Sequence, residues 1–215
     1  MFKINSLWYS AEPAEGFFSQ RIDENIDVYY QKRYRCYVFE HIPRRRVMID
    51  VGACIGIFAR PAAHVFEKVI CFEPVSRNFQ VLEKNMQGLS NVELYPLGLS
   101  DRPQHAIFDL MPLKTGETKQ VAEFVPRPDH EKYEGDLVTL DSFGFDQVDW
   151  IKVDVEGYEM QVLEGGRETI QRNRPWLLLE RNGQDHVHKQ WLNDLCGPYQ
   201  AAPVKSKTNT IWIPQ

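Results

Sequence analysis

Acidic residues follow apolar runs of the sequence at several points, and carboxylates held in this way can bind a cation or take up a proton. The run VMIDV contains Asp50, which is followed by Gly52 and Gly56, and the run VICFE ends at Glu73. Glycine lacks a Cβ atom, so the backbone of a glycine turn can approach a ligand closely. In an open α/β sheet the carboxyl ends of neighbouring strands face a shared crevice. We therefore expect Asp50 and Glu73 to line one ligand-binding site.

The glycine spacing indicates which ligand this site would take. Dinucleotide-binding folds use G-x-G-x-x-G, whereas the pattern here is D-x-G-x-x-x-G, with Ala53 at the place of the middle glycine. A carboxylate at Asp50 would repel a pyrophosphate and favour a cofactor that carries positive charge. S-adenosylmethionine has an ammonium and a sulfonium group and no phosphate, so we expect this cofactor. The two oxygens of Glu73 would accept hydrogen bonds from both ribose hydroxyls.

A third apolar run ends in GLSD, and we expect Ser100 or Asp101 to lie within reach of the adenine amino group. An ordinary turn would contain the same Ser-Asp pair. The predicted cofactor-binding residues share a position at or just after the expected strand ends. They are Asp50, Gly52, Ala53, Gly56, Glu73, Pro74, Ser100, Asp101 and Asp154.

The candidate catalytic residues are three carboxylates further along the chain. Asp154 lies near the end of the run WIKVDV, Glu156 follows two positions later and would share its face, and Glu180 ends the run WLLLE. One of them could take the proton of an acceptor hydroxyl, or Asp154 and Glu156 could hold Mg²⁺, which prefers oxygen ligands. Glu156 has a purely structural alternative, because an acidic residue at a helix start is stabilised by the helix dipole.

The elements that must position these residues alternate between short apolar segments and amphipathic ones. This order predicts an α/β fold with a doubly wound, mostly parallel sheet and helices on both faces. Strands are expected at 47–51, 69–73, 92–100, 150–155 and 176–180, with an antiparallel C-terminal edge strand at 208–214. Helices are expected at about 76–86, 158–172 and 187–195, and one more should end near residue 66.

The 215 residues are enough for one full hydrophobic core, so we expect a single main domain. Residues 1–46 are predicted to be an N-terminal helical extension, with a helix over about 24–41. Residues 47–215 would form the ligand-binding domain, with an insertion of strands and loops at about 101–137.

Composition excludes some partners. The net charge of −5 argues against binding to a nucleic-acid backbone, which rests on clustered Lys and Arg. The sequence has no secretory signal and no run of about 18 apolar residues, so we expect no membrane span and a cytoplasmic location. The four cysteines form no C-x-x-C pair and are expected to be reduced. The oligomeric state is not indicated.

Several segments carry a family resemblance. They are VMIDVGACIGIF, VICFEPVSRNFQVLEKN, LVTLDSF, VDWIKVDVEGYEMQVLEGG and RPWLLLE. In this order, over roughly residues 47–180, they resemble the FkbM family of methyltransferases. The resemblance implies a class I, Rossmann-like methyltransferase fold. It also implies S-adenosylmethionine-dependent O-methylation of a hydroxyl on a sugar or other small natural-product acceptor. Two residues depart from the family pattern: Cys54 replaces a common Asn, and Pro61 would disturb the following helix.

Two other functions stay open on the sequence. A nicotinamide-dependent oxidoreductase would share the fold, although the missing middle glycine and Asp50 count against it. A non-catalytic module of the same fold, binding a cofactor or partner without turnover, would be compatible with the departures at Cys54 and Pro61.

Overall fold

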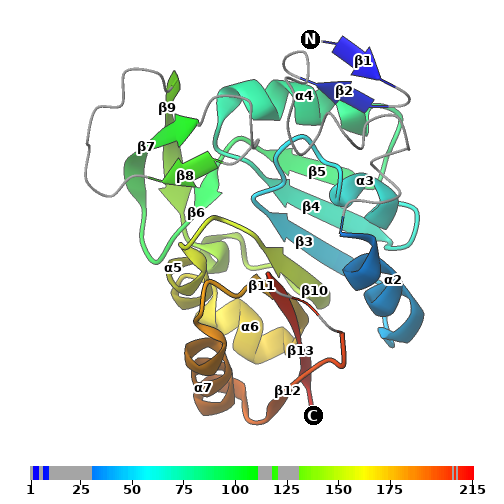
Figure 1. Cartoon of the computed structure of the whole chain (residues 1–215), viewed down its shortest axis with the longest axis vertical. Helices are drawn as coiled ribbons and strands as arrows, with labels where there is room; N and C mark the ends of the chain where they lie inside the picture. Colours follow the sequence, from blue (N-terminus) through cyan, green and yellow to red (C-terminus); the bar gives the residue numbers. More distant parts are fainter. Residues whose placement is uncertain are drawn as a thin grey trace.

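A seven-stranded sheet forms the centre of the molecule (Figure 1). The computed structural model describes residues 2–4, 7–9, 31–110, 118–120, 131–204, 206 and 208–215. The strand order is β12-β13-β11-β10-β3-β4-β5. The parallel strands are β3 (Val47–Val51), β4 (Lys68–Phe72), β5 (Val92–Tyr95), β10 (Val148–Val153) and β11 (Trp176–Glu180). This confirms the predicted doubly wound, mostly parallel sheet.

The C-terminal part of the sheet is antiparallel, as the alternating sequence predicted, but it holds two strands. β13 (Asn209–Pro214) pairs with β11, and β12 (Tyr199–Ala201) pairs with the other side of β13. The outermost strand on this side is therefore β12. β13 itself lies inside the sheet, so its first residue is placed beside the carboxyl end of β11.

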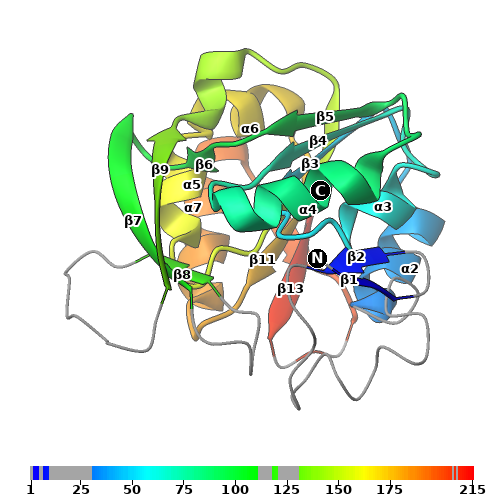
Figure 2. The ribbon, with the colours of Figure 1, turned by 90° about the horizontal axis from the view of Figure 1, so that it is seen from above.

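Helices cover both faces of the sheet (Figure 2). One face packs on α2 (Lys32–His41), α3 (Ala59–Ala62) and α4 (Ser76–Met86), and the other on α5 (Glu159–Glu164), α6 (Arg167–Asn173) and α7 (Asp185–Cys196). The apolar strands divide their side chains between these two cores by alternation, because successive residues of a strand point to opposite faces. Met48 and Trp150 enter the first core, and Ile49 and Ile151 the second.

Two expected helices differ from the sequence prediction. The helix after the glycine turn is reduced to the four residues of α3, with Pro61 in its first turn, where a missing N–H costs no hydrogen bond. The helix expected over 158–172 is divided into α5 and α6 at Gly165 and Gly166. A Cβ atom at Gly165 would lie 1.8 Å from the carbonyl oxygen of Ser100, so the chain there must be glycine.

A second sheet of four strands lies beside the first, in the order β6-β9-β7-β8. Its strands are β6 (Gly98–Leu99), β7 (Gln104–Leu110), β8 (Thr118–Gln120) and β9 (Glu131–Val138). The single strand expected over 92–100 is therefore two, β5 and β6, on either side of Pro96. Residues 111–117 and 121–130 of the predicted insertion lie outside the described residues.

The described residues of the N-terminal part contain two short strands and one helix. Its first described segment is an antiparallel pair of short strands, β1 (Phe2–Ile4) and β2 (Leu7–Tyr9), whose residue types favour extended structure. The predicted helix over 24–41 is described only from Gln31 onward, where α2 begins at Lys32. The division of the chain into an extension and a domain at residue 46 stays a prediction.

Candidate active site

The carboxyl ends of four neighbouring strands bring the predicted acidic residues to one edge of the sheet. Asp50 lies in β3, Glu73 follows β4, Asp154 follows β10 and Glu180 ends β11. The order β11-β10-β3-β4 places Asp154 between the predicted cofactor residues on one side and Glu180 on the other. The predicted cofactor residues and the candidate catalytic residues therefore lie along one edge of the sheet.

Asp50 is fully buried and its partner is a lysine that sequence reasoning missed. The ammonium of Lys152 lies 2.9 Å from Oδ1 of Asp50, 3.2 Å from the carbonyl oxygen of Gly52 and 3.8 Å from Oδ2 of Asp154. The sequence did hold a signal, because a lysine in the apolar run WIKVDV lies two residues before Asp154 and so on its face. The negative charge of Asp50 is thus balanced inside the fold.

Lys152 is the charged partner of this group. Burial opposes its charge, but Asp50 and Asp154 outweigh burial and raise the pKa of the Lys152 ammonium above its ordinary value. The ammonium also lies 5.5 Å from the centre of the Phe58 ring. A buried cation therefore lies next to the carboxylate of Asp154 at the sheet edge.

Contacts within the protein explain why both positions in the turn after β3 are glycine. Gly52 has φ of +75°, and a Cβ atom there would lie 2.2 Å from the carbonyl oxygen of Asp154. A Cβ atom at Gly56 would lie 2.1 Å from the methyl group of Met86 on α4. The approach of a ligand is therefore not needed to explain these glycines, because close packing against Asp154 and α4 already demands them. Their contact with a cofactor stays a prediction.

Glu73 lies in a nest of hydrogen-bond donors. Its Oε2 accepts the backbone N–H of Cys54 at 2.9 Å, and its Oε1 accepts the backbone N–H of Val75 at 3.0 Å and the amide of Asn78 at 3.4 Å. Burial is nevertheless the largest influence and raises the pKa of Glu73 to about 7. This carboxyl group is therefore oriented by its donors and titrates near neutral pH.

The corner predicted to border an adenine carries a hydrogen-bond network. Ser100 is fully buried, and its hydroxyl donates to Asp101 at 3.0 Å. The amide of Gln104, in β7, donates to the hydroxyls of Ser100 at 2.8 Å and Tyr158 at 3.0 Å. Gln104 and Tyr158 were not among the predicted residues, and only the fold brings them here from the second sheet and the start of α5.

The three candidate catalytic carboxylates converge. Asp154, Glu156 and Glu180 each offer one oxygen atom, and these atoms lie within 4.8 Å of one another. The side chain of Gln31 also reaches this group and donates to Oδ2 of Asp154 at 3.2 Å. Such a group could accept a proton or hold a cation with oxygen ligands.

The acidic residue at the start of the helix is Glu159 and not Glu156, for which this structural role was the alternative. Glu159, at the first position of α5, is buried and accepts the backbone N–H groups of Val155 at 3.3 Å and Gly157 at 3.1 Å. Glu156 instead lies before the helix in the left-handed region, with φ of 56°. Left-handed backbone at a residue other than glycine is costly and is found often at functional sites.

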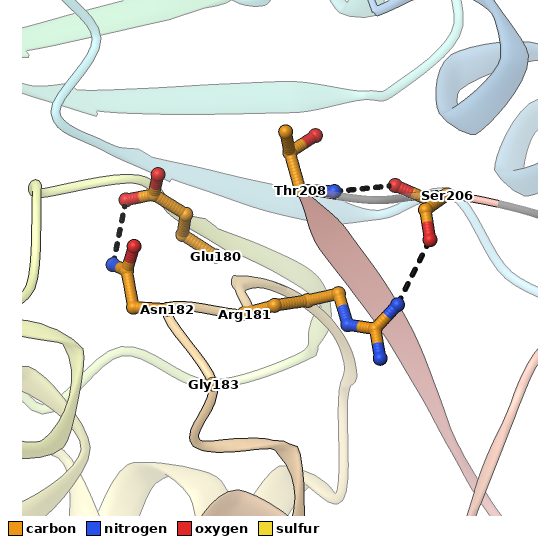
Figure 3. Close-up of a pocket in the computed structure, with 6 residues that line it drawn as sticks. All are labelled: Glu180, Arg181, Asn182, Gly183, Ser206 and Thr208. Atoms are coloured by element: carbon orange, nitrogen blue, oxygen red, sulfur yellow. Dashed lines mark hydrogen bonds between the residues drawn. The ribbon is translucent and has the colours of Figure 1, made fainter.

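A pocket of about 450 Å³ adjoins the carboxylates on the side of β11 (Figure 3). Its walls come from the turn after β11 and from the segment that leads into β13. The lining residues are Glu180, Arg181, Asn182, Gly183, Ser206 and Thr208. Glu180 belongs to both the pocket and the carboxylate group, so a ligand in the pocket would lie next to Asp154 and Glu156.

Within the part of the chain that the structure describes, no helix combines the length and apolar character needed to cross a bilayer. All four cysteines are free; Cys54 lies in the turn after β3, and Cys71 lies within β4.

Comparison with known proteins relates this chain to methyltransferases. The model of the methyltransferase FkbM domain matches residues 50–197. Methyltransferase sdnD of Sordaria araneosa is 25% identical over 169 residues, covering 60% of this chain and 64% of that protein. The 2-O-methyltransferase NoeI of Sinorhizobium fredii is 27% identical over 152 residues, covering 60% of each protein. The chain thus spans less than two thirds of the length of these curated relatives.

Solved structures show the same fold. The methyltransferase FkbM structure from Methylobacillus flagellatus superposes with a TM-score of 0.57 at 19% identity, covering 94% of this chain and 56% of that one. The structure of a ribosomal protein L11 methylase from Lactobacillus delbrueckii superposes with a TM-score of 0.52 at 10% identity, covering 85% of this chain and 76% of that one. At these identities the superpositions establish the fold.

Proposed function

The chain belongs to the FkbM methyltransferase family, and from that premise we propose that it methylates a hydroxyl group of a sugar or other small natural-product acceptor with S-adenosylmethionine. The observation that carries the proposal is the charge of the sheet edge. Five carboxylates, of Asp50, Glu73, Asp154, Glu156 and Glu180, lie along it with the buried ammonium of Lys152.

This edge suits a cationic nucleoside better than a nucleotide. Lys152 balances Asp50, and the carboxylates of Asp154, Glu156 and Glu180 lie beside this pair. A pyrophosphate would meet these charges without a basic residue in the turn after β3, which counts against a nicotinamide cofactor. The sulfonium of S-adenosylmethionine, when bound, supplies an activated methyl group, and its positive charge is attracted by the same carboxylates.

Glu73 is the proposed ribose ligand. Its two oxygens are held by donors from Cys54, Val75 and Asn78, so the carboxylate is fixed before a ligand arrives. Oε2 accepts one hydrogen bond and keeps acceptor capacity for a ribose hydroxyl, and Oε1 would accept the second hydroxyl in exchange for the 3.4 Å bond from Asn78. Ser100 and Asp101 would border the adenine, and the amide of Gln104 would fix the hydroxyls at that corner.

The carboxylates of Asp154, Glu156 and Glu180 are the proposed acceptors of a proton. As the acceptor oxygen bonds to the methyl carbon, the bond from that carbon to sulfur breaks and the sulfur keeps the electron pair. The hydroxyl proton passes to one of the three carboxylates, whose oxygen atoms lie within 4.8 Å of one another. The name of the relative NoeI, a 2-O-methyltransferase, supports a hydroxyl as the acceptor group.

A divalent cation is the alternative use of the same three carboxylates. Mg²⁺ binds oxygen ligands and would acidify a hydroxyl bound to it. Because Oδ2 of Asp154 already receives Gln31 and lies near Lys152, we favour proton transfer over metal binding.

Calorimetry with S-adenosylhomocysteine and with NAD tests the cofactor. We expect S-adenosylhomocysteine alone to bind, and Glu73→Gln to weaken this binding at least tenfold. Glu83→Gln, at an exposed carboxylate on α4, is the matched control and should bind as the wild type does. Binding of NAD, or unchanged binding in Glu73→Gln, would contradict the cofactor assignment. Release of S-adenosylhomocysteine with candidate acceptors then separates an enzyme from a non-catalytic module.

A further inference from the structure

We propose that the hydroxyl of Tyr158 donates a hydrogen bond to a ring nitrogen of the adenine of the cofactor, and that Gln104 sets the direction of this bond. The nitrogen is one of the two that flank the amino group of adenine, N1 or N7. This role rests on the proposed function, which places the adenine beside Ser100 and Asp101 and assigns no donor to its ring.

Tyr158 lies between the proposed adenine corner and the proposed ribose ligand. It packs against an apolar cluster that includes Val75. The backbone N–H of Val75 donates to Oε1 of Glu73, the proposed ribose ligand, at 3.0 Å. On its other side, the oxygen of Tyr158 lies 3.4 Å from the hydroxyl of Ser100. The Tyr158 side chain is therefore placed to meet a base whose ribose is bound to Glu73.

The close approach of α5 to Ser100 brings Tyr158 to this corner. α5 lies beside β6, which Ser100 follows (Figures 1 and 2). Directly after the helix, Gly165 lies so close that a Cβ atom there would be 1.8 Å from the carbonyl oxygen of Ser100. Before the helix, Glu159 accepts the backbone N–H of Gly157 at 3.1 Å and so fixes the turn that leads into Tyr158. Both ends of the helix therefore hold Tyr158 in place.

The amide of Gln104 sets the direction of the hydrogen bonds at this corner. Its nitrogen carries two protons and donates to the hydroxyl oxygens of Ser100 at 2.8 Å and of Tyr158 at 3.0 Å. Each hydroxyl is therefore an acceptor toward Gln104 and must direct its own proton elsewhere. Ser100 donates to Oδ1 of Asp101 at 3.0 Å, because a carboxylate is a stronger acceptor than the Tyr158 oxygen at 3.4 Å.

The hydroxyl proton of Tyr158 has no acceptor among the described residues. The two groups that contact the Tyr158 oxygen are the Gln104 amide and the Ser100 hydroxyl, and both face it as donors. The side chain of Tyr158 is only half-buried, so its proton is accessible to a ligand. The corner therefore offers one oriented donor, the Tyr158 hydroxyl, next to the acceptor Asp101.

A donor beside an acceptor matches the edge of adenine that carries the amino group. The Ser100 hydroxyl contacts both Asp101 and Tyr158, so these two groups are neighbours. In adenine an amino donor lies beside the ring acceptors N1 and N7. The amino group would donate to Asp101, and one of these nitrogens would accept from Tyr158. A purine with a carbonyl at the place of the amino group would set its oxygen against the Asp101 carboxylate and be disfavoured.

Calorimetry with purine analogues of S-adenosylhomocysteine tests this role on the full chain. The ligands are the parent compound, its 1-deaza, 3-deaza and 7-deaza forms, and S-inosylhomocysteine, which has a carbonyl in place of the amino group. We expect the 1-deaza or the 7-deaza form to bind about fivefold more weakly, as the loss of one hydrogen bond predicts. The 3-deaza form should bind as the parent does, and S-inosylhomocysteine about tenfold more weakly. Equal binding of all these ligands would overturn the proposed role.

Tyr158→Phe separates a direct hydrogen bond from a structural effect. This variant should bind S-adenosylhomocysteine about fivefold more weakly. It should bind the weaker deaza form as the wild type does, because that form has no acceptor for Tyr158 to lose. An equal loss for every ligand, or no loss at all, would overturn the proposed role. Tyr95→Phe is the matched control, at another half-buried tyrosine whose hydroxyl donates to Glu93, and should bind as the wild type.

Gln104→Glu tests the direction of the hydrogen bonds. A carboxylate of the same shape accepts from both hydroxyls, so the Tyr158 proton would turn away from the base. At neutral pH this variant should lose the preference for S-adenosylhomocysteine over the weaker deaza form, as Tyr158→Phe does. A preference equal to that of the wild type would show that Gln104 does not orient the donor.

The results for Tyr158 and for the proposed function are distinguishable. If the wild type does not bind S-adenosylhomocysteine, the proposed function itself is wrong. If the wild type binds it and Glu73→Gln weakens this binding while Tyr158→Phe does not, the cofactor site stands and the role assigned to Tyr158 is wrong.

Discussion

The ammonium of Lys152 lies 2.9 Å from the carboxylate of Asp50, and the two side chains are 4% and 0% exposed. Lys152 also contacts the carbonyl oxygen of Gly52 and lies 3.8 Å from Asp154. One buried ion pair therefore joins β3 to β10 beneath the proposed active site. Because the pair is buried, either charge alone would be left uncompensated in the interior.

Asp50→Ala should therefore destabilise the fold, whatever its effect on a cofactor. We expect the free energy of unfolding in urea to fall by about 3–5 kcal/mol, because the charge of Lys152 loses its partner. The double variant Asp50→Leu with Lys152→Met removes both charges and should recover most of this loss. If Asp50→Ala alone unfolds like the wild type, the pair has no such role.

Gly165→Ala should be among the most damaging small substitutions in the chain. The added Cβ atom would lie 1.8 Å from the carbonyl oxygen of Ser100, a backbone atom that cannot move alone. We expect a loss of about 3 kcal/mol or more in the free energy of unfolding, the upper range for overpacking. Gly166→Ala is the matched control, since its Cβ atom would meet a side-chain methyl of Leu140 at 3.0 Å. Urea denaturation of the two variants should separate them clearly, and equal stabilities would contradict this explanation.

The pKa of Glu73, raised to about 7 by burial, predicts that the stability of the free protein falls as pH rises. The folded state holds a proton that the unfolded state releases near pH 4.5, so the free energy of unfolding declines between about pH 4.5 and 7. The contribution of this group is at most about 3 kcal/mol. Urea denaturation across this range should show the decline, and Glu73→Gln should remove that part of it.

The same carboxyl group predicts the opposite pH dependence for cofactor binding. Ribose hydroxyls donate to the ionised carboxylate, and below pH 7 its ionised fraction falls about tenfold per pH unit. The affinity for S-adenosylhomocysteine should therefore weaken as pH falls from 7 to 5.5, while the free protein becomes more stable. Calorimetry at several pH values checks this, and an affinity that does not vary would exclude Glu73 as the ribose ligand.

The sequence predicts the sheet and the placement of the acidic residues at its edge. It does not predict the contacts between distant residues that hold them there. Apolar strands and helical periodicity predict the parallel sheet, because burial on both faces demands those patterns. The same pattern could not show that β13 lies inside the sheet or that Gly165 interrupts a helix, since these depend on contacts with distant residues. Asp50 was read as a free anion because its partner, Lys152, lies 102 residues away.

The departure at Cys54 has a conformational consequence. This residue has φ of 52°, in the left-handed region, where asparagine is several-fold enriched and cysteine is not. Cys54→Asn should therefore raise the free energy of unfolding by about 0.5–1 kcal/mol, with the backbone N–H still donated to Glu73. Cys54→Ser is the control, since serine has no comparable preference. Thermal unfolding of both variants tests this. Destabilisation by asparagine would show that the contacts of the Cys54 side chain, and not the backbone preference, determine the stability effect at this position.

The group formed by Asp154, Glu156 and Glu180 gives a prediction that separates proton transfer from metal binding without a known acceptor. Oδ2 of Asp154 receives the Gln31 amide at 3.2 Å and lies 3.8 Å from Lys152, so a metal would compete with a cation already in place. We expect Mg²⁺ added to protein treated with a chelator to shift the melting temperature by less than about 1 °C. A specific site filled to 100 times its dissociation constant would instead add about 2.7 kcal/mol, or roughly 5–10 °C for a chain of this size. If the wild type shows a shift of that order and Glu156→Gln abolishes it, the three carboxylates bind a metal ion, and their proposed role as proton acceptors is wrong.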